Sequence, residues 1–330
     1  MPEHLLFYAG CDKKHEQIGL AVSQDGIRFE RAGDDGLIVP VDPAVRWRDL
    51  RTCNPAVVRP DGTAGRFVMF FQGISTEQEN VSIARAVSAD GRTWTVDPEP
   101  CISWRELVAP GDGGPGSTRK AVFEPSVLHE DGRYRMWFCH LNAPVHASVS
   151  LFYAESRDGE RWELERRPLL SGDTFGFCAL HYPQVRRLDP GYELLFTLRS
   201  RRTLVDGIYR ATSADGLSWS GAEPVLRRPL RMVRSRRNVA AKAWHRVARR
   251  FWRADGQRIL GYSHPHVVEG EPDVMYIHNN HHGPRGRWYD VARVERHGGR
   301  WGRPETVFEP AADPDAWDSL FVADPFVVLA

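Results

Sequence analysis

Short apolar segments recur along the whole chain, and residues typical of turns separate them. The segments 66–71, 134–138, 192–196 and 273–277 each combine aromatic with aliphatic residues, and Gly, Pro, Asp and Ser are frequent between such segments. Short apolar runs with these boundaries are typical of β-strands. No run approaches the ~18 apolar residues that a membrane span requires. The pattern therefore predicts an all-β protein.

A first phrase repeats along this pattern: a polar residue, Asp-Gly two positions later, two further residues, and an aromatic. Asp-Gly is expected to supply the positive-φ positions of a tight hairpin turn, and the aromatic should then pack on a strand. The copies, of which the last is degenerate, are 23–29, 88–94, 156–162, 213–219 and 295–301.

A second phrase alternates with the first: a residue X, then proline, then a short aliphatic strand. Proline is tolerated at the first position of a strand, so each X-Pro pair should mark where a strand begins. The five X residues are Asn54, Glu124, Tyr182, His264 and Asp324.

The two phrases keep the same order five times, which predicts five units of about four strands each and hence a five-bladed β-propeller. A pair of β-sandwiches would not explain this order. The last X-Pro strand, 324–329, ends the chain with no partner after it, whereas 4–8 and 17–22 begin the chain without an X-Pro strand. We therefore expect the C-terminal strand to pair with 4–8, completing the first blade and leaving no open edge. Residues 1–330 should form one domain.

The five X residues should form a ring at one end of the central channel, because each occupies the same point of an innermost strand. Two carboxylates, an amide, a phenol and an imidazole converging in one concavity are typical of a binding site. The alternative is that these polar side chains only cap the strand starts.

These motifs resemble those of the five-bladed propeller glycosidases, namely glycoside hydrolase family 43 and, more distantly, the invertase-type enzymes. By blade position, the resemblance implies that Asp324 is the general base and Glu124 the general acid. It also implies that His264 is the axial histidine that holds a central water or ion. Asn54 stands where the family has an Asp that tunes the acid, and Asp324 arrives from the C-terminal strand rather than from the N-terminus.

Two carboxyl groups across a narrow channel can protonate a leaving oxygen on one side and activate water on the other. Inverting glycosidases keep this pair ~6.5–9.5 Å apart and retaining ones ~5–5.5 Å, and both ranges fit residues two blades apart. The sequence leaves open which applies. The candidate catalytic residues are thus Asp324, Glu124 and Asn54.

Further candidates for substrate binding flank the ring. Arg51 and the pair Arg119-Lys120 precede ring positions and could bind a carboxylate or phosphate, or they could be solvated loop charges. His181 and His266 lie beside Tyr182 and His264. The candidate substrate-binding residues are Tyr182, His264, Arg51, Arg119, Lys120, His181 and His266.

No metal and no cofactor are predicted, because the histidines that crowd the fifth unit lack a specific ligand spacing. Five cysteines without a CxxC pair argue against a disulfide framework and favour a reducing cytoplasm. Cys53 and Cys139 are expected to be small buried residues.

A basic insertion at about 227–253 interrupts the repeat and contains no acidic residue. It could be an anion-binding lid with a short helix, a subunit contact, or a solvated loop. Over the whole chain, 44 Lys and Arg balance 43 Asp and Glu, so no specific nucleic-acid partner is expected. The N-terminus carries no secretory signal pattern.

The leading functional hypothesis is a glycoside hydrolase-like enzyme that acts on a glycoside or a sugar-derived small molecule. Two alternatives remain at this point. One is a lyase, cyclase, isomerase or phosphorolytic enzyme for an anionic metabolite, and the other is a non-catalytic carbohydrate-binding propeller. Fold alone does not separate them.

Overall fold

The computed structural model describes residues 2–60, 66–77, 79–107, 121–141, 149–175, 179–199, 206–227, 258–283 and 286–330. Within these ranges the regular secondary structure is almost entirely β-strand, as expected, with short 3-10 turns. The turns are η1 (Arg46–Arg48), η3 (Trp104–Leu107) and η4 (Gly172–Phe175). Arg119, Lys120 and the insertion beyond Arg227 lie outside the described residues.

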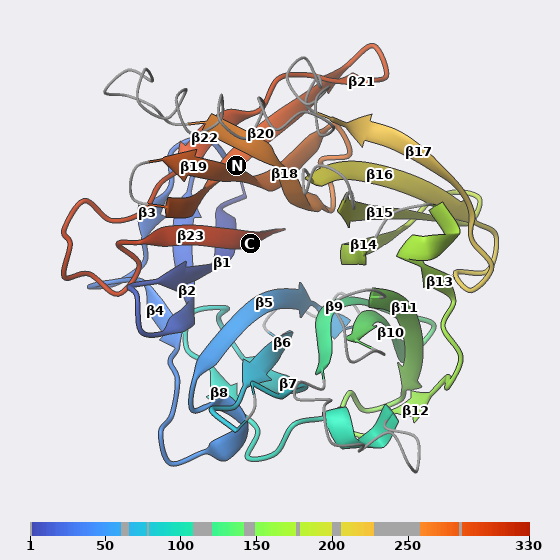
Figure 1. Ribbon diagram of the computed structural model, residues 1–330, viewed down its shortest axis with the longest axis horizontal. Coiled ribbons are helices and arrows are strands. Elements are labelled where there is room, and N and C mark those ends of the chain that lie inside the picture. Colours follow the sequence, from blue (N-terminus) through green and yellow to red (C-terminus); the bar gives the residue numbers. More distant parts are fainter. Residues whose placement is uncertain are drawn as a thin grey trace, which may run out of the picture.

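The described strands fall into five antiparallel sets around a common centre (Figure 1). The first set contains β23 (Phe321–Leu329), β1 (His4–Cys11), β2 (Glu16–Ser23), β3 (Glu30–Arg31) and β4 (Leu37–Val39). The second contains β5 (Arg51–Val58), β6 (Phe67–Ile74), β7 (Val81–Ser88) and β8 (Thr95–Val96). The third contains β9 (Ala121–Glu130), β10 (Arg133–Leu141), β11 (Val149–Ser156), β12 (Glu163–Leu164) and β13 (Leu170–Ser171).

The remaining two sets follow the same plan. The fourth contains β14 (Ala179–Arg187), β15 (Tyr192–Arg199), β16 (Asp206–Ser213) and β17 (Ser220–Leu226). The fifth contains β18 (Arg258–Val267), β19 (Val274–Gly283), β20 (Gly286–His297), β21 (Arg300–Trp301) and β22 (Glu305–Phe308). Single parallel bridges join β2 to β5, β7 to β9 and β11 to β14.

The two ends of the chain share one set. Strand β23 pairs antiparallel with β1, with Leu5 opposite Val328 and Phe7 opposite Phe326. The predicted pairing of the C-terminal strand with the N-terminal segment is therefore present. The pairing leaves neither β1 nor β23 without a neighbour, and it brings Asp324 to the centre from the end of the chain.

The Asp-Gly phrase forms turns by a mechanism that differs in part from the expected one. In Gly26, Gly91, Gly159 and Gly216 φ lies between 67° and 78°, as predicted. The preceding Asp does not adopt a positive φ. Instead its carboxylate accepts backbone N–H groups, for example those of Arg92 and Thr93 on Asp90 Oδ1, both at 2.8 Å. These hydrogen bonds lower the pKa of Asp90 to about 2.

The same turns attach each set to the preceding one. A Cβ added to Gly216 would lie 3.0 Å from the Trp137 ring, and the Trp137 indole N–H donates to Gly216 O over 2.7 Å. The Tyr276 hydroxyl likewise donates to Gly26 O over 2.6 Å. The degenerate fifth copy is different, because a Cβ on Gly298 would meet no described atom within 4 Å. The repeat therefore encodes contacts between sets as well as turns.

The apolar strand residues pack between neighbouring sets. One cluster joins Leu5 and Phe7 of β1 to Met69 and Phe71 of β6, and another joins β6 to β10 through Phe70 and Met136 and their neighbours. Within the described ranges, no helix is long and apolar enough to cross a membrane.

Candidate functional site

All five X residues adopt the same unusual backbone conformation. Their φ angles lie between 51° and 55°, in the left-handed region that non-glycine residues rarely occupy. In each of the five strands the ladder to the neighbouring strand shifts register at this point. Such a bulge leaves one residue unpaired and redirects its side chain. Five bulges therefore turn the residues Asn54, Glu124, Tyr182, His264 and Asp324 out of their ladders.

At four of the bulges a polar group of the preceding set accepts the backbone N–H of the X residue. The N–H of Glu124 donates to Gln72 Oε1 over 3.2 Å, and that of His264 donates to Thr197 Oγ1 over 3.1 Å. The N–H of Asp324 donates to Nδ1 of His278 over 3.3 Å. Buried N–H groups need such partners, so Gln72, Thr197 and His278, each on the second strand of its set, stabilise three of the bulges.

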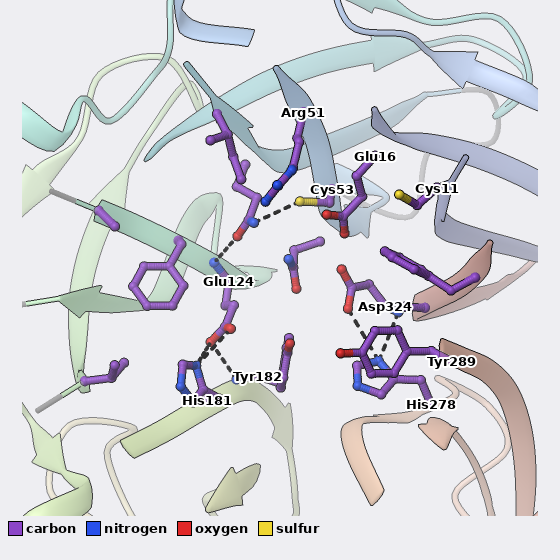
Figure 2. Close-up of a pocket in the computed structure, with 18 of the residues that line it drawn as sticks. Cys11, Glu16, Arg51, Cys53, Glu124, His181, Tyr182, His278, Tyr289 and Asp324 are labelled. Atoms are coloured by element: carbon purple, nitrogen blue, oxygen red, sulfur yellow. Dashed lines mark hydrogen bonds and ion pairs between the residues drawn. The ribbon is translucent and has the colours of Figure 1, made fainter. Parts of the chain in front are cut away.

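A cavity of about 650 Å³ opens where the bulges meet (Figure 2). It is lined by six of the predicted site residues: Arg51, Asn54, Glu124, His181, Tyr182 and Asp324. Glu124 and Asp324 extend into it from opposite sides (Figure 2). His264 and His266 do not line it.

Two imidazoles hold Asp324 on its side of the cavity. Nδ1 of His264 lies 3.1 Å from Oδ1 of Asp324, and Nδ1 of His278 lies 3.5 Å from the same oxygen. Burial alone would raise the pKa of Asp324, but the hydrogen bonds and charges of these two histidines outweigh it and hold that pKa below its usual range. Asp324 is therefore an ionised carboxylate at neutral pH.

Glu124 has a different environment. Its Oε1 lies 3.0 Å from Nδ1 of His181, and its Oε2 accepts the backbone N–H of Tyr182 over 2.8 Å. Both contacts come from β14, the innermost strand of the next set. The carboxyl group is thus fixed in orientation beside an imidazole that itself lines the cavity.

Asn54 presents an acceptor without a partner. Its Oδ1 atom is buried and makes no hydrogen bond within the described part of the chain. A buried amide oxygen without a donor is costly, so it favours a ligand that supplies one. A hydroxyl group of a substrate would do so.

His264 supports the site from behind the lining residues. Its ring stacks on Tyr182 with centroids 4.8 Å apart and planes at 23°. Because it also contacts Asp324, it connects two residues that line the cavity.

His266 connects strand sets and does not reach the cavity. Its Nε2 donates to Val327 O over 2.9 Å, and its Nδ1 lies 3.1 Å from Gln184 Nε2. Burial lowers its pKa to about 3, so it is a neutral imidazole. Ser126 has the same place in the third set, where its hydroxyl accepts the N–H of Val185. This position two residues after X therefore joins neighbouring inner strands.

The sequence analysis missed several cavity residues. Gln72 was not singled out, and His278 was considered only among the histidines that crowd the fifth unit, although each directly follows one of the apolar strand segments from which the repeat was recognised. That common position could have revealed them. Glu16, Lys13 and Lys14 also line the cavity, and they lie at the β1–β2 turn, where no repeated phrase marks them.

Potential metal ligands also meet here. The ligand atoms of His264, His278 and Asp324 lie within 4.8 Å of one another, as do those of Glu16, Cys53 and Asp324. Imidazole nitrogen and carboxylate oxygen are ordinary ligands for a divalent cation, so the first group could hold one. The expected ion or water near His264, given by family resemblance, would fall at this position.

The four described cysteines, Cys11, Cys53, Cys101 and Cys139, are free. Cys53 and Cys139 are buried, as predicted, and burial raises the pKa of both thiols. They are therefore poor nucleophiles at neutral pH.

The fold is shared with known glycoside hydrolases. A glycoside hydrolase superposes with a TM-score of 0.58 at 16% sequence identity, over 92% of this chain and 85% of that one. A thermostable family-43 glycoside hydrolase gives a TM-score of 0.53 at 14% identity, over 90% and 88% of the two chains. The GH32 β-fructofuranosidase BmSUC1 of Bombyx mori gives 0.55 at 10% identity, over 88% of this chain and 56% of that one.

No protein-family model and no curated protein matches the sequence. The likeness therefore rests on structure, and it shows the fold of the family-43 and family-32 glycoside hydrolases, which are propeller enzymes. The resemblance stated from the sequence motifs is confirmed at this level.

Proposed function

We propose that the five strand sets are the blades of a β-propeller that the C-terminal strand closes. The innermost strands support this proposal, because each of β5, β9, β14, β18 and β23 contacts the next in that order and β23 contacts β5 (Figure 1). The pairing of β23 with β1 supplies the closing blade. Closure without a free edge is the usual solution for such repeats.

We further propose that the protein is a glycoside hydrolase with Asp324 and Glu124 as its catalytic residues. One observation carries this proposal: two carboxyl groups reach one cavity from opposite sides, Asp324 beside two imidazoles and Glu124 beside one imidazole and a backbone N–H. Glycosidases need one carboxylate that stays ionised and one carboxyl group that gives a proton to the leaving oxygen. Two carboxyl groups in different environments provide for both roles.

Asp324 takes the ionised role. His264 and His278 hold its pKa low, so it accepts a proton from attacking water or attacks the sugar itself. Glu124 takes the acid role, in which its proton passes to the glycosidic oxygen as the bond breaks. His181, beside Glu124, orients the carboxyl group and can return a proton to it. The buried Oδ1 of Asn54 accepts a substrate hydroxyl.

Arg51 suits recognition of an anionic group on the substrate. Its guanidinium lines the cavity and forms no ion pair among the described residues, and Lys13 and Lys14 line the same cavity. An unpaired guanidinium binds carboxylate or phosphate in bidentate fashion. A sugar acid or sugar phosphate would therefore bind better than the neutral sugar, and Arg51→Ala should reduce the difference.

A panel of chromogenic glycosides tests the proposed activity. On the best substrate, Glu124→Gln and Asp324→Asn should each lower kcat by about 10²–10⁴-fold with little change in substrate affinity. Asp290→Asn is a matched control, because Asp290 is also buried and bonded to a histidine, His281 at 2.9 Å, but lies outside the cavity. Full activity in both cavity variants, or no turnover of any glycoside by the folded protein, would overturn the proposal.

A further inference from the structure

A second hollow, of about 520 Å³, lies on the second strand set and has not been assigned a role. We call it the blade-2 groove. Two tryptophans and a ring of polar side chains form its walls. Its lining residues include Trp47, Trp104, Asn80, Glu77, Glu99 and Arg105.

The blade-2 groove adjoins the catalytic cavity. Ile74, the last residue of β6, lines the cavity, and Ser75 directly after it lines the groove. Trp47 precedes Arg51 of the cavity by four residues, and the N–H of Leu50 between them donates to Ile74 O over 3.0 Å. The start of β5 and the end of β6 thus form a wall common to both hollows. A chain-like ligand held in the cavity could continue across this wall.

Trp47 is held rigidly in the groove wall. Its indole N–H donates to Pro98 O over 3.0 Å, and its ring lies so close to Gly73 that a Cβ there would approach it to 2.4 Å. Its ring centroid lies 6.1 Å from that of Phe71. Gly73 therefore provides the space that this indole occupies, which fixes the orientation of the ring.

Trp104 forms a second aromatic wall. The Arg105 guanidinium lies 4.5 Å from the centre of its ring, on one face of the indole. The stacked cation reduces the freedom of the ring, in the manner of other cation–π pairs. Both indoles also pack on apolar core residues, and Arg48 lies 5.7 Å from the centre of the Trp47 ring, so the aromatic surface that lines the groove is ordered.

The polar lining favours an uncharged, hydroxyl-rich ligand. Arg46 and Arg105 are matched in number by Glu77 and Glu99, so the groove has no excess charge that would select an ion. Ser75, Ser82, Ser103 and Asn80 add hydrogen-bonding groups to the lining. Aromatic faces that contact sugar C–H groups, surrounded by amide, hydroxyl and carboxylate groups that bond hydroxyls, are the chemistry that recognises a pyranose or furanose ring.

We propose that the blade-2 groove is a distal binding site for the outer units of an oligosaccharide whose terminal sugar occupies the cavity. This rests on the proposed glycosidase function and narrows its substrates to chains longer than two sugars. Trp47 and Trp104 bind sugar rings, while the reacting bond lies in the cavity.

Binding measurements separate this proposal from the catalytic one. The Asp324→Asn protein, used to prevent turnover, is titrated calorimetrically with disaccharides and tetrasaccharides of fructose, arabinose, xylose and mannose. The best tetrasaccharide should bind more tightly than its disaccharide. Adding Trp104→Ala should lower the affinity for the tetrasaccharide about three- to tenfold, as expected for the loss of one aromatic contact. The affinity for the disaccharide should not change.

Trp301→Ala is the matched control, since Trp301 is also partly buried beside an arginine, with Arg296 5.9 Å from its ring, but lies outside both hollows. It should change neither affinity. If Trp104→Ala does not fold, Arg105→Ala takes its place, because it removes an exposed side chain of the groove without disturbing the core. This variant should also lower the affinity for the tetrasaccharide. The proposed binding site would be overturned if the groove variants bound the tetrasaccharide as tightly as the Asp324→Asn protein. It would also be overturned if no tetrasaccharide bound better than its disaccharide. If the tetrasaccharide binds selectively but the wild type does not hydrolyse it, the proposed binding site is supported and the proposed hydrolase activity is contradicted.

Discussion

Nδ1 of His264 lies 3.1 Å from Oδ1 of Asp324, a residue 60 positions further along the chain. An ionised carboxylate only accepts hydrogen bonds, so Nδ1 carries the proton and donates it. The pair joins the innermost strands β18 and β23. It keeps a deeply buried carboxylate charged in a place where burial alone would favour its protonation.

Removal of that donor should change the pH dependence of activity. His264→Ala removes the larger of the two interactions that oppose the effect of burial on Asp324, so the pKa of Asp324 should rise. Because the base must be ionised, the acidic limb of the kcat/KM profile should move to higher pH, with a larger loss of activity at pH 5 than at pH 8. His297→Ala, at an exposed histidine, should leave the profile unchanged. If the acidic limb does not move in His264→Ala, His264 does not control the ionisation of Asp324.

Asn54→Asp should reveal how the acid is tuned. The change adds a carboxylate to the three that line the cavity, those of Glu16, Glu124 and Asp324, at the position where the resembling family has one. Repulsion between the added charge and the carboxyl group of Glu124 should move the basic limb of kcat/KM to higher pH and preserve or increase glycosidase activity. Affinity for an anionic substrate should fall at the same time. If activity falls and neither limb moves, Asn54 serves to accept a hydrogen bond and a charge there is not tolerated.

His140 should make the fold sensitive to acid. Burial lowers its pKa to about 4, against ~6.5 in an unfolded chain. Between pH 6.5 and pH 4 the imidazole of His140 binds a proton in the unfolded chain but not in the folded one. The folded protein therefore has its full stability above pH 6.5 and loses stability as the pH falls toward 4. The free energy of unfolding should therefore fall about 2 kcal/mol further between pH 7 and pH 5 in the wild type than in His140→Asn. Urea unfolding at the two pH values measures this, and equal pH dependence in the two proteins would contradict it.

Replacing the repeated glycine should lower the free energy of unfolding more where that glycine contacts a neighbouring set. Gly216 and Gly298 both have a positive φ, 78° and 55°, but a Cβ would meet Trp137 at 3.0 Å only at Gly216. Gly298→Ala should cost about 1–2 kcal/mol from backbone strain alone. Gly216→Ala should cost about 1–3 kcal/mol more, because it also overpacks the contact between sets. Thermal unfolding of both proteins gives the comparison, and equal losses would show that the turn does not join the sets.

Much of the architecture follows from the order of residues along the chain. Strand length, the turns at Asp-Gly and the starts at X-Pro depend on local backbone chemistry, so the repeat predicts the strand sets and the pairing of 324–329 with 4–8. The polar character of Asn54, Glu124 and Asp324 at equivalent positions likewise predicts where a site would form. The same argument could have identified Gln72 as a site residue, because it directly follows the strand segment 66–71.

Only the tertiary structure decides which of these groups meet and what each then does. The sequence analysis placed His264 and His266 together as substrate-binding candidates, yet His264 contacts Asp324 while His266 bonds Val327 O between inner strands. Their two-residue spacing puts both on one strand, but the bulge at His264 changes the direction in which each side chain points, and no local pattern predicts that. The contact of His181 with Glu124 and the hydrogen bond from Asp324 to His278 join different sets. Such contacts depend on how twisted sheets pack around a common centre, so they are fixed by distances in space and not by spacing along the chain.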